Sequence, residues 1–165
     1  KYPTEGNGDR VIEAQPALSE ADVMLEAWWN TSNTGNTDFS QMVRLQPGVL
    51  SSYEADLEDN AGWNLAWNNN GAWAEVVGNQ SAPAQNAWMR IGLSLSGNQL
   101  RAWRDGVQIV PTSGAYAIGG TPFGAGNIGF RKHDVGGAVW LDDVTVRRYT
   151  EPEPAVGVGT AVRSP

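Results

Sequence analysis

The sequence predicts an all-β protein in which two antiparallel sheets pack face to face. Three observations carry this prediction. The 165 residues include 20 Gly and 8 Trp but only 11 Lys and Arg, a composition typical of strands joined by tight turns rather than of helices. Apolar and polar residues alternate with a period of two along most of the chain. Turn signals rich in Gly, Asn and Pro lie between the alternating segments.

The alternating segments define about ten to twelve short strands. In chain order they cover residues 10–15, 21–30, 39–45, 52–58, 62–68, 72–77, 88–97, 99–106, 107–110, 127–131 and 138–149. The Asn70-Gly71 pair supplies the positive φ angle that a two-residue hairpin requires, and residues 111–126 are predicted to be a long Gly- and Pro-rich loop. These elements fit a two-sheet sandwich.

One segment permits two interpretations. Ser19 and Asp22 match a capping box, so residues 21–30 are compatible with the start of a helix. The same residues alternate as a strand, with Val23 and Trp29 on one side and Trp28 on the other. We favour the strand because the rest of the chain is all-β in character.

Length and charge limit the possible functions. The length suits one domain, and we expect an entry segment at 1–9, a sandwich at 10–149 and an extended linker or tail at 150–165. The chain has no Cys, so thiolate chemistry is excluded, and its single His excludes a two-histidine mechanism. A net charge of −7 argues against nucleic acid and anionic membranes as partners. No run approaches the roughly 20 apolar residues of a membrane helix.

The order of the segments resembles the concanavalin A-like lectin and glucanase superfamily, especially its laminin-G-like jelly rolls. The segments that carry the resemblance are VMLEAWWNTSN, MVRL followed by YEADLE, AWMRIGLSLSGNQLRAWRDGVQI, and NIGFR followed by GGAVWLDDVTVRRY. Together they cover roughly residues 10–149. The resemblance implies a jelly-roll sandwich and a carbohydrate-binding module of a secreted or cell-surface protein.

The last predicted strand contains Asp142 and Asp143. Asp142 shares its parity with Val144 and Val146, which are expected to face the interior, and a buried carboxylate needs a partner. By resemblance to the superfamily, Asp142 would bind a structural calcium ion with Glu13 as a second ligand. The alternative is that the two aspartates hydrogen-bond backbone NH groups at the end of the sheet.

Three carboxylates alternate along one strand as Glu54-x-Asp56-x-Glu58, with neighbours about 6.7 Å apart on one face. The pattern resembles the Glu-x-Asp-x-Glu strand of laminarinase-type glucanases, in which the first Glu is the nucleophile and the last is the acid/base. This chain departs from that pattern at Ala55, where a bulky apolar residue is usual, and in its shorter length. Sugar or calcium contact, ion pairing with Arg44 or Arg90 on neighbouring strands, and a plain solvated face are the alternatives to catalysis.

Sugar-binding surfaces combine aromatic faces with polar side chains that bind hydroxyl groups. Strand parity assigns Trp29, Trp63, Trp67 and Trp140 to the core or to a sheet face. The better candidates for sugar stacking are Trp28, Trp73 and Trp103. For any single Trp, core packing is an alternative.

Arg44 lies in the predicted strand 39–45, which precedes the strand that contains Glu54 and Asp56. If these three side chains share one sheet face, they form a charged, planar patch that suits either sugar hydroxyl groups or a structural salt bridge.

The sequence therefore predicts a non-catalytic, lectin-like module that binds a polysaccharide or glycan, with a structural calcium ion and an extracellular or cell-surface location. A structural or adhesive module that contacts neighbouring domains or subunits is the first alternative. The second is a small β-glucanase that uses Glu54 and Glu58.

Overall fold

The computed structural model describes residues 10–14, 18, 20–32, 38–58, 62–79, 86–133 and 138–152. The predicted entry segment 1–9 and nearly all of the predicted tail therefore lie outside the described residues, as do the side chains of Glu58, Asn79 and His133. Within the described part, no helix is long and apolar enough to span a membrane.

All regular elements in the described residues are strands. They are β1 (Arg10–Glu13), β2 (Val23–Thr31), β3 (Asp38–Leu45), β4 (Ser52–Glu58), β5 (Gly62–Asn69), β6 (Ala72–Asn79), β7 (Met89–Ser96), β8 (Gln99–Arg104), β9 (Val107–Val110), β10 (Tyr116–Ala117), β11 (Asn127–His133) and β12 (Val139–Arg148).

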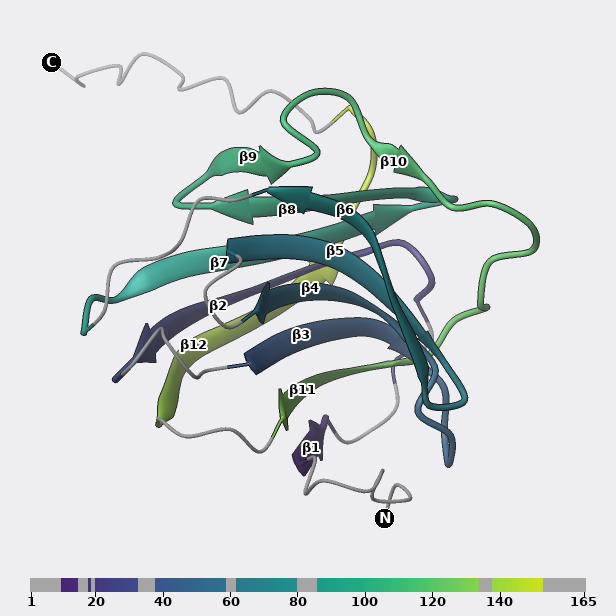
Figure 1. The fold of residues 1–165 in the computed structure, drawn as a ribbon. Helices are drawn as coiled ribbons and strands as arrows, with labels where there is room; N and C mark the ends of the chain where they lie inside the picture. Colours follow the sequence, from purple (N-terminus) through teal and green to yellow (C-terminus); the bar gives the residue numbers. More distant parts are fainter. Residues whose placement is uncertain are drawn as a thin grey trace, which may run out of the picture.

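The strands form two antiparallel sheets that face each other (Figure 1). Sheet A has the order β1-β11-β3-β4-β5-β6. Sheet B has the order β10-β8-β7-β2-β12, with β9 paired to β8. The predicted all-β sandwich is confirmed, and the segment open to a helix is strand β2. The predicted loop 111–126 contains one element that the sequence did not reveal, the two-residue strand β10.

The core lies between the sheets and is built from one side of each strand. Trp29 of β2 is fully buried, and its ring meets Phe39 edge to face at 4.5 Å and Trp63 at 5.2 Å. Phe39 in turn stacks on Phe130 of β11 at 6.1 Å. The strand parities that predicted Trp29 and Trp63 as core residues are therefore confirmed.

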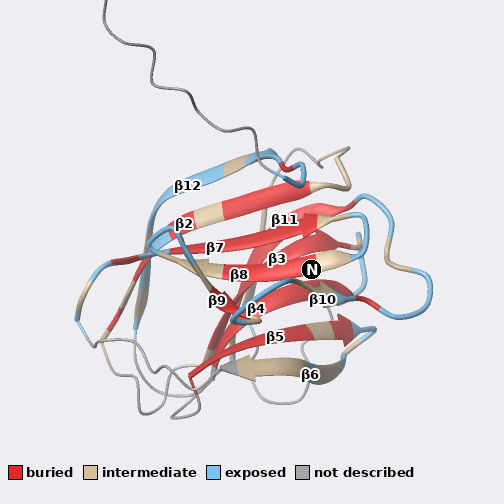
Figure 2. Cartoon of the chain, turned by 90° about the horizontal axis from the view of Figure 1, so that it is seen from above, coloured by how far each residue is buried: buried red, intermediate tan, exposed pale blue. Residues whose placement is uncertain are grey.

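The central strands of sheet A and the edge strand β12 of sheet B differ in exposure. Figure 2 shows β3, β4 and β5 of sheet A as buried almost throughout, whereas β12 of sheet B is largely exposed. On sheet A, therefore, side chains on both sides of the central strands are enclosed.

A β-bulge in β12 overturns the predicted orientation of Asp142. Asp142 pairs with Trp28 and Thr145 pairs with Glu26, so β12 contains one residue more than β2 between these pairs. The extra residue is accommodated at Asp143, which has a φ angle of 46°, and it shifts the parity of the strand. Asp142 consequently shares the outer face with Trp140 and is exposed rather than directed into the sandwich.

Candidate functional site

The outer side of sheet A carries a continuous set of polar side chains, which we call the polar face. Strand register aligns them in rows. One row runs through Arg131, Ser40, Asp56, Asn64 and Gly78, from β11 to β6. The polar face also includes Ser52, Glu54, Asn68, Trp73 and Glu75. Three of the six predicted sugar-binding residues, Glu54, Asp56 and Trp73, therefore lie on one face.

Glu54 and Asp56 of β4 belong to the enclosed part of the polar face. The Ser40 hydroxyl donates a hydrogen bond of 2.5 Å to Oδ1 of Asp56, and the Ser52 hydroxyl donates one of 2.8 Å to Oε1 of Glu54. Nη1 of Arg131 lies 3.6 Å from Oε2 of Glu54. Burial raises the pKa of Glu54, and Arg131 opposes that shift.

Glu54 is 0% exposed and Asp56 is 2% exposed. A plain solvated face, which was one alternative for this strand, is thus wrong for Glu54 and Asp56. The third carboxylate of the sequence pattern, Glu58, has its side chain outside the described residues.

The accessible part of the polar face lies on the edge strand β6. Trp73 is half-buried and pairs with Asn68, and the exposed Glu75 pairs with Ala66. A Cβ atom at Gly78 would lie only 2.7 Å from Oε1 of Glu75 and 3.0 Å from Oδ1 of Asn64. The missing side chain at Gly78 thus leaves room for the Glu75 carboxylate and the Asn64 amide.

The enclosed part of the polar face contains polar atoms without hydrogen-bond partners. Among the described residues, these include Nδ2 of Asn64, Nδ2 of Asn68 and Oε2 of Glu54. Buried polar groups are normally hydrogen-bonded, to protein or to water. These enclosed atoms are not accessible to a ligand, and the accessible polar group on the same face as Trp73 is the carboxylate of Glu75.

Arg44 does not belong to the polar face, and the predicted patch that joined it to Glu54 and Asp56 is wrong. Arg44 has a φ angle of 51° at the end of β3, so its side chain leaves the alternation of the strand. Its guanidinium group is 4% exposed and donates to the carbonyl oxygens of Ala21, Gly97 and Phe123 at 2.8–2.9 Å. Instead, Arg131 of β11 lies near Glu54. The two residues are far apart in the sequence, so alternation along a strand could not predict that they meet.

Trp28 and Trp103 lie on the opposite side of the molecule, on the outer side of sheet B. Trp28 is 37% exposed, as predicted for a stacking candidate. Trp103 is half-buried, and its Nε1 donates a 3.0 Å hydrogen bond to the Ser94 hydroxyl. Trp88 and Trp140, which are not among the predicted stacking candidates, are 49% and 48% exposed. Trp140 lies on the same outer side as Trp28, because residues opposite each other in an antiparallel pair share a face.

The predicted calcium ligands do not fit a common site. Asp142 is exposed on β12 of sheet B, and its Oδ1 accepts a hydrogen bond from the backbone NH of Asp143. Glu13 lies on β1 of sheet A, where its Oε1 accepts a hydrogen bond from Asn127. No group of three His, Cys, Asp or Glu side chains suited to a metal ion occurs among the described residues.

Comparisons with known proteins reveal similarity in structure but not in sequence. No family model matches the chain, and no curated protein matches it. Among solved structures, the carbohydrate-binding module CBM66 from Bacillus subtilis matches with a TM-score of 0.70 at 16% identity, over 86% of this chain and 83% of that one. A variant of human galectin-16 matches with a TM-score of 0.57 at 10% identity, over 90% of this chain and all of that one.

A glycosidic hydrolase also matches, with a TM-score of 0.54 at 12% identity, over 76% of this chain and 57% of that one. Together these structures confirm the predicted concanavalin A-like jelly-roll fold. At such low identity the similarity extends to the fold alone, because one fold supports many functions.

Proposed function

We propose that this protein is a non-catalytic carbohydrate-binding module whose polar face binds a glycan along β4, β5 and β6. The observation that carries the proposal is the arrangement on β6. A half-buried indole, Trp73, and an exposed carboxylate, Glu75, lie on the same face as Asn68 and Asn64 of the neighbouring strand β5.

The chemistry of this arrangement matches that of a sugar. A pyranose has an apolar C–H face that packs on an indole ring, and hydroxyl groups that both donate and accept hydrogen bonds. Trp73 supplies the apolar surface, and Glu75 supplies acceptors at the accessible edge. Several solved structures that share the fold are named as a carbohydrate-binding module or as galectins, which supports the proposal by analogy.

Glycan-array binding followed by affinity electrophoresis in polysaccharide gels tests the proposal. We expect Trp73→Ala to weaken binding of the best glycan by roughly tenfold or more, about 1.4 kcal/mol, because the stacking surface is lost. Glu75→Gln, which removes one charge without changing shape, should weaken it less.

Trp28→Ala provides the matched control, because it removes an exposed indole from the opposite side of the sandwich. If no glycan binds, or if Trp28→Ala weakens binding as much as Trp73→Ala, the proposed site is wrong. The secreted or cell-surface location is part of the same proposal, and fractionation of the host cells tests it.

A structural or adhesive role is the second candidate, and the exposed edge strand β12 favours it. This ten-residue strand pairs only with β2 among the described strands and is mostly exposed. An exposed edge strand can add a strand from another molecule. Concentration-dependent assembly in analytical ultracentrifugation, without glycan affinity, would favour this role.

The β-glucanase alternative requires Glu54 to reach a substrate. Its burial and raised pKa suit a general acid in principle, but the surrounding side chains enclose it. Hydrolysis of β-1,3/1,4-glucans that disappears in Glu54→Gln would establish catalysis.

A further inference from the structure

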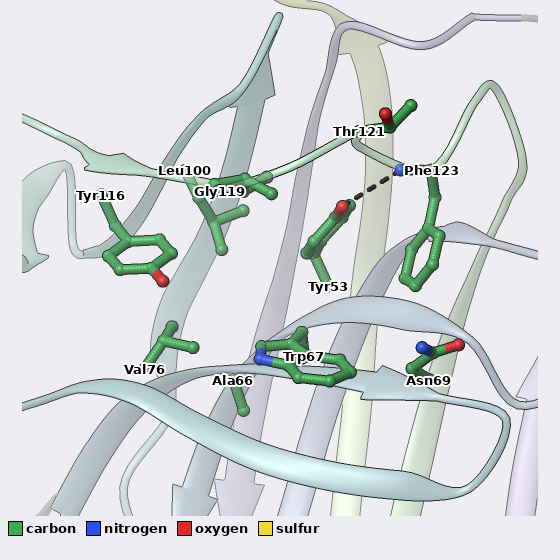
Figure 3. Close-up of a pocket in the computed structure, with 11 residues that line it drawn as sticks. Tyr53, Ala66, Trp67, Asn69, Val76, Leu100, Tyr116, Gly119, Thr121 and Phe123 are labelled. Carbon is green, nitrogen blue, oxygen red and sulfur yellow. Dashed lines mark hydrogen bonds between the residues drawn. The ribbon is translucent and has the colours of Figure 1, made fainter.

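A cavity of about 370 Å³ lies where the edges of the two sheets meet, away from the polar face (Figure 3). Residues from β5 and β6 of sheet A line one side, and residues from β8, β10 and the following loop line the other. The cavity lies on the inner side of β4, β5 and β6, whereas the polar face lies on the outer side of the same strands.

The lining changes in polarity from the floor to the mouth. Leu100 of β8 is fully buried, and Val76 of β6 is half-buried. Four aromatic rings surround the cavity: Tyr53, Trp67, Tyr116 and Phe123. The exposed residues of the lining are polar or small, and they are Asn69, Gly119 and Thr121. A ligand with one apolar end and one polar end matches this gradient.

The wall opposite Trp67 is fixed in place. The backbone NH of Phe123 donates a 3.1 Å hydrogen bond to the Tyr53 hydroxyl, drawn as a dashed line in Figure 3. The carbonyl oxygen of Phe123 accepts a 2.9 Å hydrogen bond from Nη1 of the buried Arg44. The rings of Tyr53 and Phe123 also contact each other at 5.0 Å. The loop therefore cannot fold into the cavity without breaking these contacts, and Arg44 acts as a positioning residue for the wall.

Charge and size define the ligand. None of the described residues that line the cavity is charged, so an ionised group would enter without a counter-charge, which is unfavourable in an enclosed apolar site. An apolar cavity of about 150 Å³ suffices to bind benzene, so this cavity has room for an aromatic ring with a substituent.

We propose that this cavity binds an uncharged aromatic ring that carries a hydroxyl or glycosyl group. The ring lies between the four aromatic side chains, and the polar substituent lies at the mouth beside Asn69 and Thr121. The site is separate from the proposed glycan site on the polar face and does not depend on it.

Isothermal titration calorimetry of the whole chain with four probes tests the ligand class. We expect phenyl β-D-glucopyranoside and phenol to bind at one site, because both place a neutral ring in the cavity. Methyl β-D-glucopyranoside, which lacks the ring, and benzoate, which adds a charge, should each bind at least about tenfold more weakly than phenyl glucoside. Equal binding of the methyl and phenyl glucosides would overturn the proposal, as would failure of phenyl glucoside to bind.

Variants locate the binding. Gly119→Phe places a large side chain at the mouth, where a Cβ atom meets nothing within 4 Å, so the fold should persist while phenyl glucoside binding falls by about tenfold or more. Tyr116→Phe keeps the ring and should retain binding of phenol within about threefold. Thermal melting verifies that each variant is folded.

Trp28→Ala is the matched control, because it removes an exposed indole that belongs to neither proposed site, and it should leave phenyl glucoside binding unchanged. If Gly119→Phe is folded and binds phenyl glucoside as the wild type does, the cavity is not the site. Phenol carries no sugar, so its binding reports on the cavity alone and separates a failure of this proposal from a failure of the proposed glycan site.

Discussion

At the scale of single residues, burial gives two charged side chains roles that their sequence neighbours do not suggest. Arg44 leaves the strand alternation through its φ angle of 51° and donates to carbonyl oxygens of three separate segments. Hydrogen bonds from a charged group are among the stronger ones in proteins. Arg44 therefore ties the end of sheet A to the turns around it and to the wall of the cavity.

Glu54 gives rise to a pH-dependent stability. Its ordinary pKa is 4.5, and burial raises that value in the folded protein. Between pH 4.5 and the raised pKa of the folded state, the carboxyl of Glu54 is ionised in the unfolded chain but still protonated in the folded chain. The unfolded state therefore binds fewer protons in this pH range. The stability that Glu54 contributes is thus fully present below pH 4.5 and is lost as the pH rises through the folded-state pKa.

We therefore expect that Glu54→Gln, which cannot ionise, does not lose stability in this way as the pH rises. The melting temperature of the variant relative to the wild type should rise as the pH increases above 4.5. Differential scanning calorimetry between pH 4 and 8 measures this difference, with Glu75→Gln as the control because Glu75 is exposed. Parallel pH profiles for Glu54→Gln and the wild type would contradict the assignment.

At the scale of elements, β-bulges decide which side chains share a face. The bulge in β12 turns Asp142 outward and leaves Val146 packed against the core. A second irregularity interrupts the pairing of β6 with β5 between Leu65 and Ala66. Each register shift reverses the alternation for every residue beyond it. In β12 and in β6, odd-numbered residues therefore point to one side of the sheet before the shift and to the other side after it.

The β12 bulge depends on the left-handed backbone of Asp143, and we expect substitutions there to follow φ preference. Asp143→Val should lower the free energy of unfolding by about 1–2 kcal/mol, because a β-branched residue disfavours a positive φ. Asp143→Gly should stay within about 1 kcal/mol of the wild type. Urea denaturation measures both.

Val144→Thr is the control for this comparison, since Val144 is an exposed neighbour with no positive φ. If Asp143→Val and Asp143→Gly are equally stable, the bulge does not rest on the conformation of Asp143.

At the scale of the whole molecule, the sandwich separates three surfaces of different chemistry. The polar face lies outside sheet A, exposed tryptophans such as Trp28 and Trp140 lie outside sheet B, and the aromatic cavity lies between the sheet edges. Glu13 and Asp142, the predicted metal ligands, belong to different sheets. A core that includes Trp29 and Trp63 stabilises the sandwich without disulfides.

Because Glu13 and Asp142 each have a protein hydrogen-bond partner and do not share a site, we expect the fold to be independent of calcium. Thermal melting should give the same transition in excess EDTA and in millimolar calcium. A calcium-induced rise in melting temperature that Asp142→Asn abolishes would restore the original prediction of a site at Asp142.

The sequence predicted the sandwich well because alternation is a local property. Tyr53, Ala55 and Leu57 alternate with Glu54 and Asp56, and this pattern identified β4 and the side of it that packs in the core. The same logic placed Trp29 and Trp63 in the core. Alternation alone did not distinguish a core position from an exposed sheet face for Trp140, which lies on the outer side of the edge strand β12, and it did not reveal β10, which has only two residues.

The sequence by itself thus determined the fold class, the strands and the residues that alternate together. Only the tertiary structure decided which strands are neighbours. It brings Arg131 close to Glu54 and directs Arg44 away from Glu54 and Asp56. It also places Trp28 and Trp73 on opposite outer sides of the sandwich. The physical reason is that alternation fixes the side of a strand on which a residue lies, whereas pairing between distant strands and the bulges within them fix what that side meets.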